Sequence, residues 1–216
     1  MSVIAAHIPN ELEQEYDLEE LLSAALEDEE TLTGLHLKGE YLTGEAMKRI
    51  SFSKCILEGC RFLGCQMEQS EFVDVRFERC DFSSSFLQGS YFLRCQFVDC
   101  KGIGSQMQES SFKNVSVENT NFELSAFDES LFSSVQFKNS RFVQAWFGSC
   151  RIKGLECSDS DFTKANFFHT SLKGLDFSSC KIEGISVAVE DLAGIIVDIP
   201  QAAQLAGLLG VCIKKE

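Results

Sequence analysis

Large apolar residues recur at every fifth position through most of this chain. The pattern runs from Phe52 to Val187 without a change of phase, and 17 of the 19 Phe residues hold this position. Leu, Met, Ile and Val fill the remaining places, and only Gly102 and Cys157 depart from the pattern. A repeat this regular predicts one structural unit copied many times along the chain.

A period of five fits neither a helix, which rotates about 100° per residue, nor a flat strand, which changes face at every residue. It fits a backbone that turns a corner once per five-residue block and points the central side chain of each block inward. A second inward position lies two residues earlier and holds small residues, which also recur every twenty residues in columns such as Ser70, Ser90, Ser110 and Ser130. We therefore expect four blocks per coil, with coils stacked about 4.8 Å apart like neighbouring strands.

These blocks resemble those of the pentapeptide-repeat family. The family pattern is a small residue, a polar residue, Leu or Phe, and two further polar residues, and the block from Cys80 to Ser84 follows it closely. The resemblance covers residues 50–189 and implies an all-β solenoid, a right-handed quadrilateral β-helix with helical caps at both ends. Twenty-eight blocks give about seven coils and a rod about 34 Å long.

Residues 1–49 and 190–216 are predicted to close the two ends of the solenoid. Asp17 followed by Glu20 has the capping-box pattern, and an apolar helix face follows as far as Leu26. Whether residues 31–49 form an imperfect first coil is left open, because that coil would bury Glu40 and Glu45.

At the C-terminal end, Pro200 is expected to open a helix over residues 201–209, which stops at Gly210. A short strand is expected to follow over residues 211–213.

Composition and charge narrow the function. The 216 residues are 44% hydrophobic and 24% charged, which is typical of one ordinary soluble domain. The net charge of −14 is concentrated near the N-terminus: residues 1–49 hold 12 acidic and 3 basic residues, residues 50–189 hold 17 and 14, and residues 190–216 hold 4 and 2. We expect a cytoplasmic protein that binds neither a membrane nor nucleic acid directly, since it has no long apolar run, no signal-peptide pattern and an acidic balance.

The Cys, His and Gly residues that could form a catalytic or metal site are better explained by structural roles in the solenoid. Eight of the ten Cys residues occupy the small inward position, so we expect free buried thiols and no metal site. His7, His36 and His169 are far apart in the sequence and have no catalytic motif beside them. Gly102 is expected to mark a local bulge. We predict that the chain is not an enzyme and needs no cofactor.

Two sets of outward residues are candidates for a partner-binding surface. Leu124, Val143 and Trp146 are large and apolar at positions where the repeat favours polar residues, and Phe86 lies on the same side. These side chains could equally lie flat over the turn backbone. The second set is acidic and approaches a stripe along one edge, comprising Glu58, Glu78, Asp99 and Glu118.

The C-terminal tail resembles that of the Qnr and MfpA quinolone-resistance proteins. The shared residues are Gln201, Ala202, Leu205, Leu208 to Val211, and Ile213. This resemblance implies a DNA mimic that binds DNA gyrase and topoisomerase IV and protects them from quinolones, and a homodimer formed through Leu205, Leu208, Leu209, Val211 and Ile213. The alternative is a protein-protein interaction scaffold unrelated to topoisomerases. We place topoisomerase binding slightly ahead, although the nearly balanced charge of the repeat region counts against it.

Overall fold

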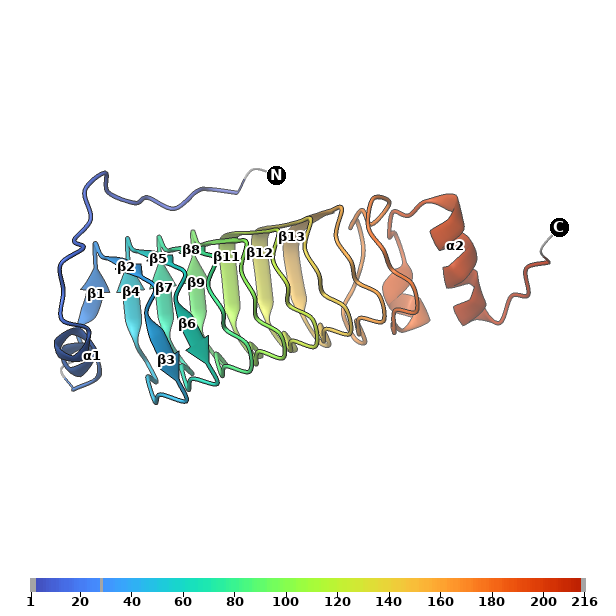
Figure 1. Cartoon of the computed structure of the whole chain (residues 1–216). Coiled ribbons are helices and arrows are strands. Elements are labelled where there is room, and N and C mark those ends of the chain that lie inside the picture. Colours follow the sequence, from blue (N-terminus) through green and yellow to red (C-terminus); the bar gives the residue numbers. More distant parts are fainter. Residues whose placement is uncertain (1–2, 28, 215–216) are drawn as a thin grey trace.

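The computed structural model is a rod of stacked coils with a helix at each end, shown in Figure 1, and it describes residues 3–27 and 29–214. It confirms the predicted all-β solenoid. Helix α1 (Leu18–Glu27) lies at one end and α2 (Ile199–Ala206) at the other, with short 3-10 turns η1 (Val189–Leu192) and η2 (Gly207–Leu209). The strands are β1 (Thr31–Thr33), β2 (His36–Lys38), β3 (Tyr41–Thr43), β4 (Ser51–Ser53), β5 (Ile56–Glu58), β6 (Arg61–Leu63), β7 (Glu71–Val73), β8 (Arg76–Glu78), β9 (Tyr91–Leu93), β10 (Gln96–Val98), β11 (Ser111–Glu118), β12 (Leu131–Lys138) and β13 (Arg151–Ser158).

Every strand pairs in parallel with the segment twenty residues along the chain. On the first face of the rod, β1 pairs with β4, β4 with β7 and β7 with β9. On the second face, β2, β5, β8 and β10 follow in the same order. The third face carries β3 and β6 and then bridges such as Asp81 to Lys101, and the fourth carries bridges such as Ala126 to Trp146. The register of twenty confirms four blocks per coil.

The corners of the rod are made by residues with positive φ. They fall at every fifth position, for example Asp74 (φ 58°), Leu124 (φ 60°) and Gly104 (φ 67°). The left-handed conformation redirects the chain by one corner without breaking the pairing between coils. It costs a residue with a Cβ atom roughly 1–2 kcal/mol, whereas glycine adopts it freely.

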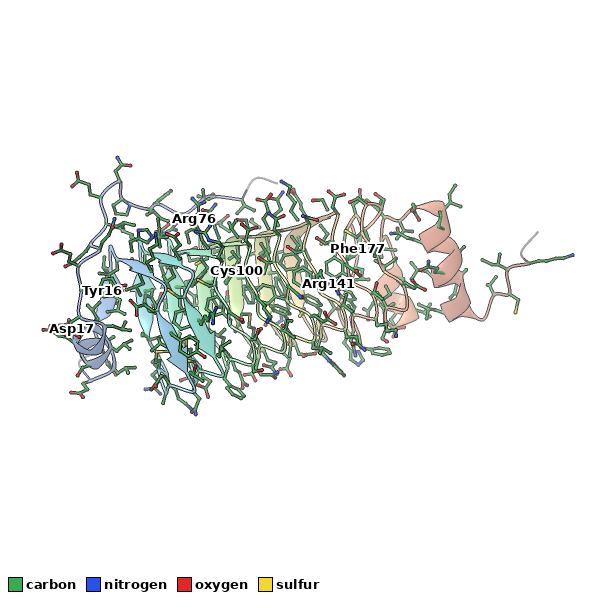
Figure 2. The ribbon with its side chains drawn as sticks, viewed as in Figure 1. Tyr16, Asp17, Arg76, Cys100, Arg141 and Phe177 are labelled. Carbon is green, nitrogen blue, oxygen red and sulfur yellow. The ribbon has the colours of Figure 1, made fainter. Side chains whose placement is uncertain are left out.

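The core consists of Phe rings stacked from coil to coil. All 17 Phe residues of the five-residue pattern are buried, whereas Phe86 and Phe168, which lie outside it, are each 45% exposed. Phe72 stacks on Phe92 with ring centroids 5.0 Å apart, and further rings continue the column. Phe177 and Cys100, both labelled in Figure 2, are buried in this core.

The small inward residues also hydrogen-bond to the backbone. The Ser110 hydroxyl donates to the carbonyl of Leu87, 3.1 Å away, and accepts the N–H of Ser90 at 3.1 Å. The buried Cys80 thiol donates in the same way to the carbonyl of Leu57 at 3.1 Å. Buried backbone groups therefore find partners, which explains why Ser, Thr and Cys share this position.

Residues 31–49 form a coil in register with the next one, so the rod begins before Phe52. The expected burial of two charges does not occur. Glu40 is half-buried and accepts a hydrogen bond from the Tyr16 hydroxyl at 2.5 Å, and Glu45 is exposed. The end of the stack leaves these positions open to solvent.

The predicted bulge at Gly102 is not formed. Its neighbour Lys101 keeps the regular pairing with Asp81 and Asn121. A Cβ atom at Gly102 would lie 2.4 Å from the Phe122 ring, so this ring occupies the space that a side chain would need.

Both ends of the rod carry the predicted helices, but the predicted C-terminal strand is absent from the described residues. Asp17 accepts the N–H of Glu20 at 3.2 Å, as expected at the start of α1. At the start of α2, Asp198 and Gln201 form a capping box. The predicted strand over 211–213 is wrong, because this segment lies beyond the last coil and the described residues contain no strand that pairs with it. In the part of the chain that the structure describes, no helix is long and apolar enough to cross a membrane.

Candidate protein-binding surfaces

Three outward apolar residues meet at the corner between the third and fourth faces. We name Leu124, Val143 and Trp146 the apolar corner. The Leu124 N–H donates to the Val143 carbonyl at 2.9 Å, so the two residues are neighbours in adjacent coils. Leu124 is 49% exposed and Trp146 is 51% exposed, whereas Val143 is half-buried. Half of each of the two larger side chains therefore remains available to a partner.

The acidic residues lie on the second face and its edge, and most are paired with bases. Glu58 accepts from Arg79 at 2.6 Å and from the His36 ring at 2.9 Å. The hydrogen bond from His36, with the nearby Lys38 and Arg79, lowers the pKa of Glu58 below its usual value although burial opposes the change. Much of the negative charge of this face is therefore neutralised locally.

Two of the other three acids are also paired with bases. Glu78 lies 2.7 Å from Arg76, and Glu118 lies 2.7 Å from Lys138. Exposed Asp99 accepts a hydrogen bond from the Asn119 side chain at 3.1 Å. In register, Val98 stands between Glu78 and Glu118. The acidic side chains therefore do not make a continuous stripe.

The two predicted sets are not brought together. The acids belong to the second face and Trp146 belongs to the fourth, and these are opposite sides of a four-sided rod. A partner of ordinary size would contact one set or the other.

The C-terminal tail presents a third surface. Leu205 packs against the core cluster and closes the last coil. Beyond it, four apolar residues are between 43% and 62% exposed, namely Leu208, Leu209, Val211 and Ile213. Of the residues predicted for a dimer interface, one therefore closes the rod and four face solvent.

Two further features were not predicted from the sequence. Phe168, on the fourth face, adds an exposed ring near Trp146 in the next coil, and its position outside the five-residue pattern was the available signal. The second is the course of residues 3–12, which run along the outside of the rod (Figure 1). No periodic pattern in those residues marks this course.

The hollows on the surface are open to solvent. One of about 340 Å³ is lined by residues of both charges, among them Arg141, Asp161 and Lys181. Among the described residues, His, Cys, Asp and Glu do not gather in any group of three or more that could hold a metal ion.

Comparison with known proteins points to one family. A model described as "Pentapeptide repeat region" matches residues 70–147, and one described as "Pentapeptide repeats (8 copies)" matches residues 47–83. No curated protein matches this sequence.

Similar solved structures include a trypsin-treated form of QnrB1, described as a plasmid-mediated fluoroquinolone resistance protein. It is 22% identical, with a TM-score of 0.46, over 86% of this chain and all of that chain. HetL, a pentapeptide repeat protein involved in heterocyst differentiation regulation in the cyanobacterium Nostoc sp. strain PCC 7120, is 11% identical, with a TM-score of 0.39, over 85% of this chain and 98% of its own. A pentapeptide repeat protein of the Arabidopsis thaliana thylakoid lumen is 22% identical, with a TM-score of 0.36, over 46% of this chain and 66% of its own.

Proposed function

Because this chain is a pentapeptide-repeat protein, we propose that it acts as a non-catalytic protein-binding rod whose partner contacts the apolar corner. The observation that carries the proposal is the exposure of Leu124 and Trp146 at outward positions where the repeat favours polar residues. Tryptophan is among the residues that most often anchor protein interfaces, and contiguous exposed apolar patches often mark interaction surfaces.

The backbone at Leu124 supports this interpretation. Leucine is strained at φ 60° and gains little burial at a half-exposed corner, so neither the turn nor the core benefits from it. A contact with a partner would use the side chain that the fold itself does not need.

Site-specific crosslinking tests the apolar corner. A photoreactive amino acid placed at Leu124 is expected to capture a partner in cells, and Trp146→Ser should reduce the yield of that adduct at least fivefold. The same amino acid at exposed Lys138, on the opposite face, is the matched control. Equal adducts at both positions, or none at Leu124, would refute the proposal.

Binding to a type II topoisomerase is the second candidate. The exposed apolar tail supports it, because a second copy joined there would place two rods end to end, as an extended DNA mimic requires. We rank topoisomerase binding second because the acids of the second face are paired with bases. This pairing reduces the negative electrostatic potential with which that face would imitate DNA.

Gyrase and light scattering test this second candidate together. We expect the wild type to be dimeric at tens of micromolar and Leu208→Glu to be a folded monomer. If the rod is a DNA mimic, the wild type should protect purified gyrase from a quinolone in a supercoiling assay and Leu208→Glu should protect it less. A monomeric wild type, or gyrase that is indifferent to excess protein, would exclude this candidate and leave the apolar corner untouched.

A further inference from the structure

The N-terminal arm, which we define as residues 3–12, occupies one edge of the rod. It leaves the α1 end and runs along the corner between the first and second faces (Figure 1). At its start, Glu13 pairs with the first coil: its N–H donates to Gly34 at 2.9 Å and its carbonyl accepts from His36 at 2.9 Å. Figure 2 shows Arg76 on the edge along which the arm runs.

The arm is extended and perpendicular to the strands. The His7 N–H donates to Asp74 Oδ1 at 2.9 Å, and the Ile4 N–H donates to Asn114 Oδ1 at 3.4 Å. Asp74 and Asn114 hold the same corner position two coils apart, a separation of about 9.6 Å at the usual strand spacing. Three residues of the arm cover this distance, which matches a fully extended chain.

The corner supplies what an extended peptide needs. We name Asp74, Arg94 and Asn114 the arm corner. Asp74 is only 3% exposed and receives two hydrogen bonds from Arg94, at 2.6 and 2.7 Å, besides the one from His7. Half-buried Val73 and Leu93 adjoin Asp74 and Arg94 in the chain and face the same edge. The corner thus combines side-chain acceptors for backbone N–H groups with an apolar margin.

Few interactions hold the ten residues of the arm on the rod. Among the described residues, the hydrogen bonds to His7 and Ile4 are those that join residues 3–12 to the rod, and both end on side chains. Strands that run across the arm cannot form a ladder with it. Val3, Ala6 and Ile8 are half-buried and Ile4 is 52% exposed, so undocking would uncover little of the core. Asp74 and Arg94 would keep each other as partners.

We propose that the arm corner is a binding site for an extended, uncharged apolar peptide segment of another protein, and that the N-terminal arm is its intramolecular occupant. The arm itself, with the sequence Val-Ile-Ala-Ala-His-Ile over residues 3–8, shows the chemistry that the site accepts. A partner segment of this kind displaces the arm. The site lies diagonally across the rod from the apolar corner, so it is independent of the proposed function.

A labelled peptide with the sequence of residues 3–10 tests the proposal by fluorescence polarisation. The wild type is expected to bind it weakly, because the tethered arm competes at a high effective concentration. Ala6→Glu, which places a charge at a half-buried arm position, should bind the peptide at least tenfold more tightly. Hydrogen exchange should show in the same variant that the amides of Ile4 and His7 lose protection.

Adding Asp74→Ala to Ala6→Glu should weaken peptide binding at least tenfold, whereas adding Asp159→Ala should leave it unchanged. Asp159 is an exposed corner residue remote from the arm and serves as the matched control, with melting temperatures confirming that each variant is folded. Equal affinity of wild type and Ala6→Glu, or equal effects of the two aspartate substitutions, would overturn the proposal. A wild-type dimer that Ala6→Glu abolishes would also overturn it, because the occupant would then be the arm of a second copy.

Discussion

The inward or outward direction of a single side chain decides how much the rod depends on it. Phe82 is buried and Phe86 is 45% exposed, four residues later in the same coil. Phe82→Asp should destabilise the chain by more than about 4 kcal/mol, since it removes a core ring and buries a carboxylate. Phe86→Asp should cost less than about 1 kcal/mol. Urea denaturation measures both, and similar losses would contradict the assignment of the inward positions.

Corner residues give a second prediction. Leu124→Gly should raise the free energy of unfolding by about 0.5–1 kcal/mol, because glycine relieves the left-handed strain and little burial is lost. Gly104 holds the same corner one coil earlier and has open space around its missing Cβ. Gly104→Leu should therefore be destabilising by a similar amount. A loss of stability in Leu124→Gly would show that Leu124 supports the turn.

Asp74 makes the docking of the arm depend on pH. Burial tends to raise the pKa of Asp74, but the hydrogen bonds from Arg94 and from the His7 N–H outweigh it, with the charges of Arg94 and His7 acting in the same direction, and the pKa is lowered. Arg94 lowers this pKa whether or not the arm is docked, so the ionised form of Asp74 favours docking only through its interactions with His7. This contribution is present at neutral pH and is lost as pH falls through the lowered pKa of Asp74.

The amide shift of His7, followed by NMR from pH 5 to pH 2, should therefore change with a midpoint below about 3.9. Asp74→Asn should abolish that transition. A midpoint at or above the ordinary value would contradict the interactions with Arg94 and His7 that lower this pKa.

At the scale of the element, α2 closes the rod through one buried side chain. Gln201 Nε2 donates to the carbonyls of Phe177 and Cys180, at 2.9 and 2.6 Å, and its oxygen accepts the N–H of Asp198 at 2.9 Å. Gln201→Ala should lower the free energy of unfolding by roughly 2–3 kcal/mol, because two carbonyls of the last coil lose their donor. Exposed Gln204→Ala is the control and should change it by less than about 0.5 kcal/mol.

The elements also show what the sequence could predict. The coils were predictable because the inward positions are set by a local period, and the two helices were predictable from Asp17 and Pro200. The pairing of the acids was not, because long side chains reach across coils, as Arg79 does to Glu58. The arm was not predictable either, since His7 contacts Asp74 through a hydrogen bond that spans 67 residues and leaves no periodic trace.

For the whole molecule, the rod should protect its thiols. Eight Cys residues are buried, Cys157 is half-buried and Cys212 is exposed. Burial raises the pKa of the Cys95 and Cys150 thiols to about 12. The thiolate is the form of cysteine that reacts with Ellman's reagent. We therefore expect about one thiol per chain to react rapidly in the native protein and all ten to react after denaturation. Cys212→Ser should remove the rapid equivalent, and two or more rapid thiols in that variant would show that the coils open.

The constant register of twenty residues means that each coil adds the same length to the rod. Every outward position continues into the next coil in its own column, as Ala126 does into Trp146. Inserting or deleting one whole coil would shift the distance between the arm corner and the C-terminal tail by about 4.8 Å and leave each residue in its column. The separation of two binding surfaces can therefore be adjusted in fixed increments without altering the chemistry of either surface.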